Sequence, residues 1–173
     1  EKGRNPIHEA MPALAELADT QWDGGDESFT PTSFQLSNIR AGAGANNVIP
    51  GTLDAVFNFR FSPASPVDSL KRRVHAILDH YKLDYQLTWT LGSEPFITKP
   101  GRLVDALAGA VIGTIGVEPA LSTSGGTSDG RFLAAVSREL VEFGLVNASM
   151  HAIDEHVRIA DIAPLSTIYE RTI

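Results

Sequence analysis

The sequence Thr52-Leu-Asp-Ala-Val-Phe-Asn-Phe-Arg-Phe61 alternates apolar and polar side chains along most of its length. Its odd-numbered positions are all apolar, whereas Asp54, Asn58 and Arg60 take even-numbered positions. Alternation with a period of two is typical of a strand that buries one face and exposes the other. Val56 is a mild exception to the pattern. We therefore expect a half-buried strand at residues 52–61 that carries Arg60 on its polar face.

The residues on either side of this strand extend the pattern into an α/β unit. Asn5 and Pro6 are a helix-start signal, because Asn caps a helix and Pro suits its first position. Pro12 lies inside this helix and should kink it or delay its start. Ser65 and Asp68 are spaced like a capping box before an apolar helical stripe. In chain order, the pattern predicts a helix from residue 6, strands at 32–39 and 52–61, a helix at 67–81 and a strand at 84–91.

This α-β-β-α-β order becomes a ferredoxin-like β-α-β-β-α-β unit if one strand is supplied upstream. Gly92-Ser-Glu-Pro95 is the expected boundary, so that residues 1–92 and 93–173 form separate parts. Two short strands make a marginal sheet by themselves, so we expect the second part to complete a larger sheet elsewhere. Its predicted elements are a helix at 101–115 ended by Gly116, strands at 118–121 and 139–143, a helix at 131–136 and a last helix capped by Asp161.

The stretch Ser122-Thr-Ser-Gly-Gly-Thr-Ser-Asp-Gly-Arg-Phe132 combines three glycines with five hydroxyl groups and one carboxylate. Glycine allows a ligand to approach the main chain closely, and the hydroxyl and N–H groups at a helix start can bind an anionic or polar ligand. No Lys follows the glycines, so this is not a Walker loop. A polar surface loop without a ligand is the alternative for such a cluster.

Residues 144–160 form a long predicted loop that carries His151, Asp154, Glu155 and His156. A lone loop histidine is usually exposed or hydrogen-bonded, and is a metal ligand in a minority of cases. A zinc site needs three or more ligands, and no HExxH helix is present. These residues therefore do not build a closed metal site, and any further ligands must come from elsewhere.

The composition limits the classes of function. The net charge of −7 argues against a nucleic-acid or anionic-membrane partner, since neither attracts an acidic surface. There are no cysteines, which excludes disulfides and thiolate chemistry. No apolar run approaches the roughly 20 residues that cross a bilayer. The polar start shows no signal peptide and has no initiating Met, so we expect the chain to be part of a longer protein.

Five stretches of the chain resemble one known family: residues 34–39, 44–51, 57–62, 122–132 and 147–151. In order and spacing they are similar to the desuccinylases of the M20 metallopeptidase family, over the chain from Asn5 onward. The resemblance implies an α/β (α+β) fold in which residues 1–92 are a ferredoxin-like dimerisation lid without its first strand. Residues 93–173 would be the C-terminal segment of a zinc-hydrolase catalytic domain.

The resemblance also implies a reaction, the hydrolysis of the succinyl amide of N-succinyl-LL-diaminopimelate. Two zinc ions, or cobalt in their place, would activate a bridging water, and a Glu would move its proton. His151 would be a metal ligand. That Glu and the other ligands have no counterpart here, so no catalytic residue lies in this chain and we expect it to be inactive alone. The substrate's carboxylates and polar groups would be bound by Arg60, Asn46, Asn47, Gly126, Thr127 and Asn147.

The implied partners are a small-molecule substrate and a second copy of the chain, bound through the lid, in a cytoplasmic enzyme. Two alternatives stay open. One is a related M20 deacylase, such as acetylornithine deacetylase, which would share the motifs but act on another acyl group. The other is a non-catalytic dimerisation module.

Overall fold

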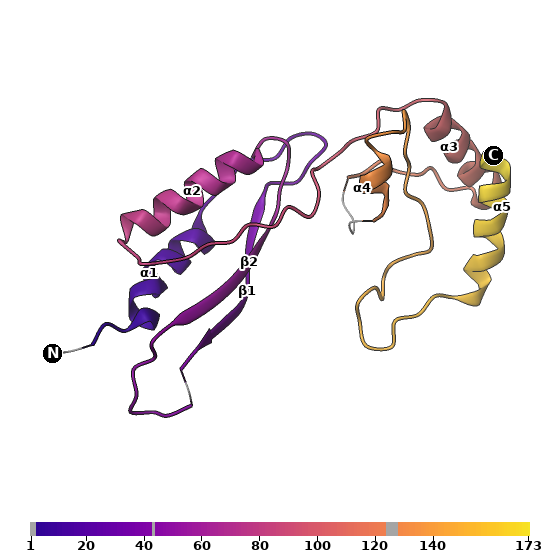
Figure 1. The fold of residues 1–173 in the computed structure, drawn as a ribbon. Coiled ribbons are helices and arrows are strands. Elements are labelled where there is room, and N and C mark those ends of the chain that lie inside the picture. Colours follow the sequence, from indigo (N-terminus) through magenta and orange to yellow (C-terminus); the bar gives the residue numbers. More distant parts are fainter. Residues whose placement is uncertain (1–2, 43, 124–127) are drawn as a thin grey trace. The chain divides into compact units, whose positions relative to one another are not determined.

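The computed structural model describes residues 3–42, 44–123 and 128–173 (Figure 1). The chain divides into two compact units, residues 1–95 and residues 96–173, each with its own core. The described residues form one antiparallel two-stranded sheet together with helices. This confirms the predicted mixed α/β class.

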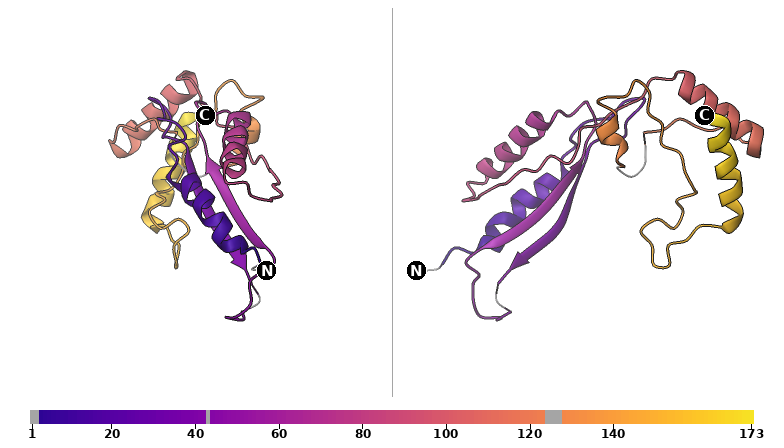
Figure 2. Two further views of the ribbon diagram at one scale, coloured as in Figure 1. Left: turned by 90° about the vertical axis from the view of Figure 1, so that its left-hand side faces the viewer. Right: turned by 45° about the vertical axis from the view of Figure 1, so that its right-hand side comes forward.

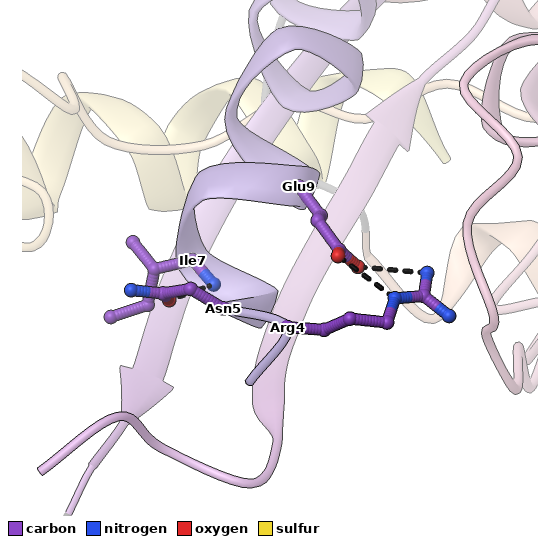
Figure 3. Close-up of polar contacts among 4 residues, drawn as sticks. All are labelled: Arg4, Asn5, Ile7 and Glu9. Carbon is purple, nitrogen blue, oxygen red and sulfur yellow. Dashed lines mark hydrogen bonds and ion pairs between the residues drawn. The ribbon is translucent and has the colours of Figure 1, made fainter. Parts of the chain in front are cut away.

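The first helix, α1 (Pro6–Asp19), begins where the sequence predicts. The side-chain oxygen of Asn5 accepts a hydrogen bond from the backbone N–H of Ile7 at 3.0 Å (Figure 3). Arg4 forms an ion pair with Glu9 at 2.9 Å, in the first turn of the helix (Figure 3). Both contacts hold the start of α1 at Pro6, because a helix start leaves backbone N–H groups unpaired and favours nearby negative charge.

Pro12 lies inside α1 and does not delay its start, so that part of the prediction was wrong. Proline removes one backbone hydrogen bond from a helix interior. The loss is offset because Ala13 and Leu17, on the inner face of α1, are completely buried. Tertiary packing therefore outweighs the local preference of Pro12.

Strands β1 (Ser33–Ala41) and β2 (Leu53–Arg60) form at the two predicted positions and pair antiparallel. Phe34 lies opposite Phe59 in this register, and the register shifts between Leu36 and Asn38. A shift of this kind is a β-bulge, which bends the strand and increases its twist. The inner face of the hairpin is consequently aromatic near Phe34 and more exposed beyond the bulge.

Helix α2 (Val67–His80) packs with α1 beside the β1–β2 hairpin (Figures 1 and 2). Trp22, in the segment after α1, is 5% exposed and meets the Phe59 ring edge-on at 4.7 Å between centroids. Aromatic pairs in this geometry contribute beyond their buried area. The buried core of the first unit consists of Ala13, Leu17, Trp22, Phe34, Leu70, Val74 and Leu78.

Residues 84–91 do not form the predicted strand. Their side chains alternate as expected, since Tyr85, Leu87 and Trp89 are half-buried against the core. In a ferredoxin-like order, however, a strand before α1 separates β2 from this segment, and the described residues before α1 form no strand. Side chains hold the segment instead. The hydroxyl of Tyr85 donates to Asp79 at 2.9 Å, and the Trp89 ring lies 5.7 Å from that of Phe57.

The carboxylate of Asp23 joins three parts of the first unit. It accepts hydrogen bonds from the backbone N–H of Gly25 at 2.9 Å and of Thr32 at 2.8 Å. It also accepts from the hydroxyl of Ser62 at 3.1 Å and of Ser65 at 2.5 Å. The predicted capping box at Ser65 was therefore wrong, because its hydroxyl bonds to Asp23 and α2 has no side-chain cap. Burial alone would raise the pKa of Asp23, but these hydrogen bonds hold it well below its usual value.

The second unit contains α3 (Arg102–Ile115), α4 (Gly130–Leu133), a 3₁₀ turn (Ile159–Asp161) and α5 (Ile162–Thr172). Helices α3 and α5 pack together through Leu107, Ala110, Val111 and Ile168. Gly116 ends α3 in the left-handed conformation at φ +70°, as predicted. Asp161 is the N-cap residue of α5, as predicted, but its carboxylate pairs with Arg158 at 2.8 Å and makes no capping hydrogen bond.

Neither predicted strand of the second unit is formed in the described residues. Residues 139–143 contact the rest of the unit through side chains: Glu139 accepts from the N–H of Leu103 at 2.7 Å and so caps α3. The hydroxyl of Thr98 bonds both the carbonyl and the N–H of Leu140. A strand needs a neighbouring strand for its backbone groups, and these bonds replace one. The predicted helix at 131–136 is shortened to α4.

We expect Asp23→Asn to lower the free energy of unfolding by about 2 kcal/mol at pH 7, because an amide cannot accept all four bonds. The folded-state pKa of Asp23 is lowered, so the stabilisation is present above its unfolded-state pKa of ~3.9 and is lost as the pH falls below it. Urea unfolding of wild type and variant from neutral to acid pH measures this. Glu27→Gln, in the same segment, is the matched control. A difference between Asp23→Asn and wild type that stays constant into acid would contradict the account.

Candidate functional site

The first unit places its predicted binding residues at two separate positions. Asn46 and Asn47 are exposed in the loop that joins β1 to β2. Arg60 is exposed at the opposite end of β2, seven residues after its first residue, Leu53. At about 3.4 Å per residue this separation is roughly 24 Å. In one copy of the chain, therefore, the asparagines do not converge on Arg60.

The described end of the glycine-rich stretch is held by a carboxylate that the sequence analysis did not single out. The hydroxyl of Ser128 donates to Glu142 and accepts from the N–H of Gly130 at 2.9 Å. Gly130 is buried, and a Cβ at this position would lie 2.6 Å from the Glu142 carboxylate. A Cβ at this position would therefore force the neighbouring side-chain atoms to shift. The predicted site residues Gly126 and Thr127 lie outside the described residues.

His151 lies in a tightly folded loop, residues 145–157, in which two non-glycine residues adopt positive φ. His151 has φ +62° and Asp154 has φ +61°. This left-handed region is sterically unfavourable for residues with a Cβ. Hydrogen bonds that hold the loop offset the cost, and Ser149 makes two of them. Its hydroxyl donates to the carbonyl of His156 at 2.7 Å and accepts from the N–H of His156 at 3.0 Å.

The side chain of His151 is exposed, and its imidazole makes no hydrogen bond within the described residues. Its backbone N–H donates to the carboxylate of Glu155 at 3.3 Å. The second histidine, His156, donates from Nδ1 to the carbonyl of Asp154 at 2.8 Å and belongs to the framework of the loop. Both histidines are exposed: among the described residues neither ring nitrogen of His151 is bonded, and His156 keeps Nε2 unbonded.

Asn147 belongs to the same loop as His151. It lines a small cavity of about 210 Å³ inside the loop. Its backbone carbonyl accepts a hydrogen bond from the backbone N–H of Met150 at 3.0 Å. The loop therefore brings Asn147 and His151 into one local structure, as their spacing suggests. The cavity is lined by Leu145, Val146, Asn147, Ser149, Met150, Glu155, His156 and Val157.

In the described part of the chain, no three His, Asp or Glu side chains are grouped so that they could hold a metal ion. The sequence analysis did not single out Glu142 or Ser149, whose roles depend on folding. The available signal for Ser149 was its type, because Ser in a loop often bonds nearby backbone groups. The helices in the described ranges are all too short or too polar to span a membrane.

The match to a family model and the matches to curated proteins agree with each other. Residues 1–86 match the model of the peptidase dimerisation domain, M20_dimer. The chain is 60% identical over 170 residues to a succinyl-diaminopimelate desuccinylase of Azoarcus sp. (strain BH72), covering 98% of this chain and 45% of the relative. For the enzyme of that name from Cupriavidus necator the identity is 59% over 167 residues, covering 96% and 44%. The chain spans less than half the length of these curated relatives.

We expect Gly130→Ala to lower the free energy of unfolding by about 1–2 kcal/mol, because the new methyl group displaces Glu142 from Ser128 and costs that charged hydrogen bond. Gly109→Ala is the matched control, since a Cβ there meets no atom within 4 Å. In the interior of α3 this control should stabilise the chain by about 0.5–1 kcal/mol. Urea unfolding measures both. Equal stability of Gly130→Ala and wild type would show that the packing around Gly130 is loose.

Proposed function

This chain belongs to the M20 peptidase family through its dimerisation domain, and we propose that it is part of a metal-dependent amide hydrolase that releases succinate from N-succinyl-LL-diaminopimelate. The observation that carries the proposal is the 60% identity, over 98% of the chain, with a relative named succinyl-diaminopimelate desuccinylase. In this proposal residues 1–92 are the lid, and residues 93–173 are the C-terminal segment of the catalytic domain.

His151 is, in this proposal, a neutral imidazole ligand of one of two zinc ions, which cobalt could replace. The structure fits this role in one respect: the ring is exposed and makes no hydrogen bond among the described residues. The described residues supply no complete set of ligands, so the remaining ligands come from outside them. When bound, the metal lowers the pKa of a water molecule and polarises the substrate carbonyl.

The other predicted site residues supply polar groups for a substrate that carries several carboxylates. The guanidinium of Arg60 can bind a carboxylate through two parallel hydrogen bonds. The side chains of Asn46 and Asn47 can both donate and accept. Because they lie at the other end of β2 from Arg60, we assign them to the active site of a second copy. Gly126, Thr127 and Asn147 complete the set in this proposal.

The proposed homodimer has a physical basis in the first unit. Among the residues that the structure describes, β1 pairs with β2 alone, so its outer edge offers backbone groups to a second copy. We expect the chain to sediment as a dimer at micromolar concentration and to dissociate on dilution. Sedimentation velocity over a wide concentration range measures this. A monomer at every concentration would contradict the assignment of residues 1–92 as a dimerisation lid.

The proposed reaction is tested in a chimera in which this chain replaces the matching segment of the Azoarcus sp. (strain BH72) relative. We expect the chimera to hydrolyse N-succinyl-LL-diaminopimelate with added zinc, and the isolated chain to be inactive. His151→Ala should lower kcat/KM of the chimera by at least ~100-fold, because a metal ligand is lost. His8→Ala, an exposed histidine in α1, is the matched control and should leave kcat/KM unchanged.

Turnover of N-acetylornithine by the chimera in place of the succinylated substrate would assign the chain to another M20 deacylase. Turnover by the isolated chain would overturn its proposed inactivity. An inactive but correctly folded chimera, with wild-type circular dichroism and sedimentation, would support the alternative of a non-catalytic dimerisation module.

A further inference from the structure

The loop around His151 is closed by one hydroxyl group. The Oγ atom of Ser149 bonds both the carbonyl and the N–H of His156, at 2.7 Å and 3.0 Å. A single half-buried side chain thus satisfies both backbone polar groups of a residue seven positions away. Within the closed segment, the N–H of Ala152 donates to the carbonyl of Ser149 at 3.0 Å. His151 therefore lies within a loop that the hydrogen bonds between Ser149 and His156 close.

The conformation of His151 depends on this closure. Its φ of +62° is sterically unfavourable for any residue with a Cβ, so surrounding contacts must maintain it. One such contact is direct, since the N–H of His151 donates to the Glu155 carboxylate at 3.3 Å. The imidazole itself takes no part in the loop's hydrogen bonds among the described residues. The loop thus fixes the main chain of His151 while its ring stays available.

We propose that Ser149 and Glu155 are positioning residues, which hold the main chain of His151 in the left-handed conformation and so direct its imidazole for metal binding. The proposal rests on the proposed function, in which His151 is a metal ligand. Its physical basis is that a ligand held before the metal arrives loses less conformational freedom on binding. Groups that orient a metal ligand typically change metal affinity by about 10–100-fold when they are removed.

The closure is tested on the chain itself by nuclear magnetic resonance. The coupling between the amide and α protons of His151, read together with the nuclear Overhauser effect between the same two protons, distinguishes positive from negative φ. The amide exchange rate of His156 reports its bond to Ser149. We expect Ser149→Ala to move His151 to negative φ and to speed exchange at His156 by about tenfold. Ser149→Thr, which keeps the hydroxyl, should restore both values.

Two further variants sharpen this test. Ser137→Ala removes another hydroxyl that bonds a backbone carbonyl, at Glu139, and should leave the His151 loop unchanged. Glu155→Ala should weaken the left-handed conformation of His151, whereas Glu155→Gln keeps an acceptor oxygen and should preserve it. If Ser149→Ala retains both the coupling at His151 and slow exchange at His156, Ser149 does not close the loop and the proposal fails.

The effect on metal binding is measured in the chimera by competition with a zinc chelator. We expect Ser149→Ala to raise the zinc Kd by at least ~10-fold at an unchanged melting temperature, and Ser149→Thr to restore it. Unchanged affinity, in a variant whose loop is shown to open, would overturn the positioning role and leave the proposed function intact. A wild-type chimera that binds no zinc would overturn the proposed function and the positioning role with it. This holds even if nuclear magnetic resonance shows that Ser149 closes the loop.

Discussion

The carboxylate of Asp23 is the interaction on which the first unit depends. Its four hydrogen bonds reach the turn after α1, the residue before β1 and the link between β2 and α2. Three of the groups around it, Thr32, Ser62 and Ser65, are buried polar residues, which would be costly to leave unpaired. Arg73 adds two bonds to the backbone of the same turn and stacks on Trp22. Sheet and helices therefore meet at one polar centre, beside an aromatic core.

Local sequence pattern was sufficient to predict an element where that element depends only on its own residues and their near neighbours. The cap at Asn5, the alternation of residues 52–61 and the glycine at the end of α3 all act within a few positions, and each prediction was confirmed. Predictions that needed a partner elsewhere failed. Residues 84–91 and 139–143 lack a neighbouring strand in the described chain, and Ser65 bonds to Asp23, 42 positions away, rather than to its own helix.

The candidate site shows the same division. The types and spacing of Asn147 and His151 pointed to one loop, and the structure places both there. The closure by Ser149 was beyond sequence reasoning, because it depends on the loop turning back on itself to reach His156. The binding role of Arg60, Asn46 and Asn47 stays a prediction. In one copy β2 keeps them at its two ends, a distance that composition cannot reveal.

The extended segment at residues 84–91 has a consequence for handling this chain. Its backbone makes no hydrogen bonds to other described residues, and β2 is paired on one side only. Unpaired strand edges of this kind are templates for aggregation, because any extended peptide can add to them. The net charge of −7 opposes such growth through mutual repulsion, and salt screens that repulsion. The purified chain should accordingly keep best in dilute buffer and precipitate first at high ionic strength.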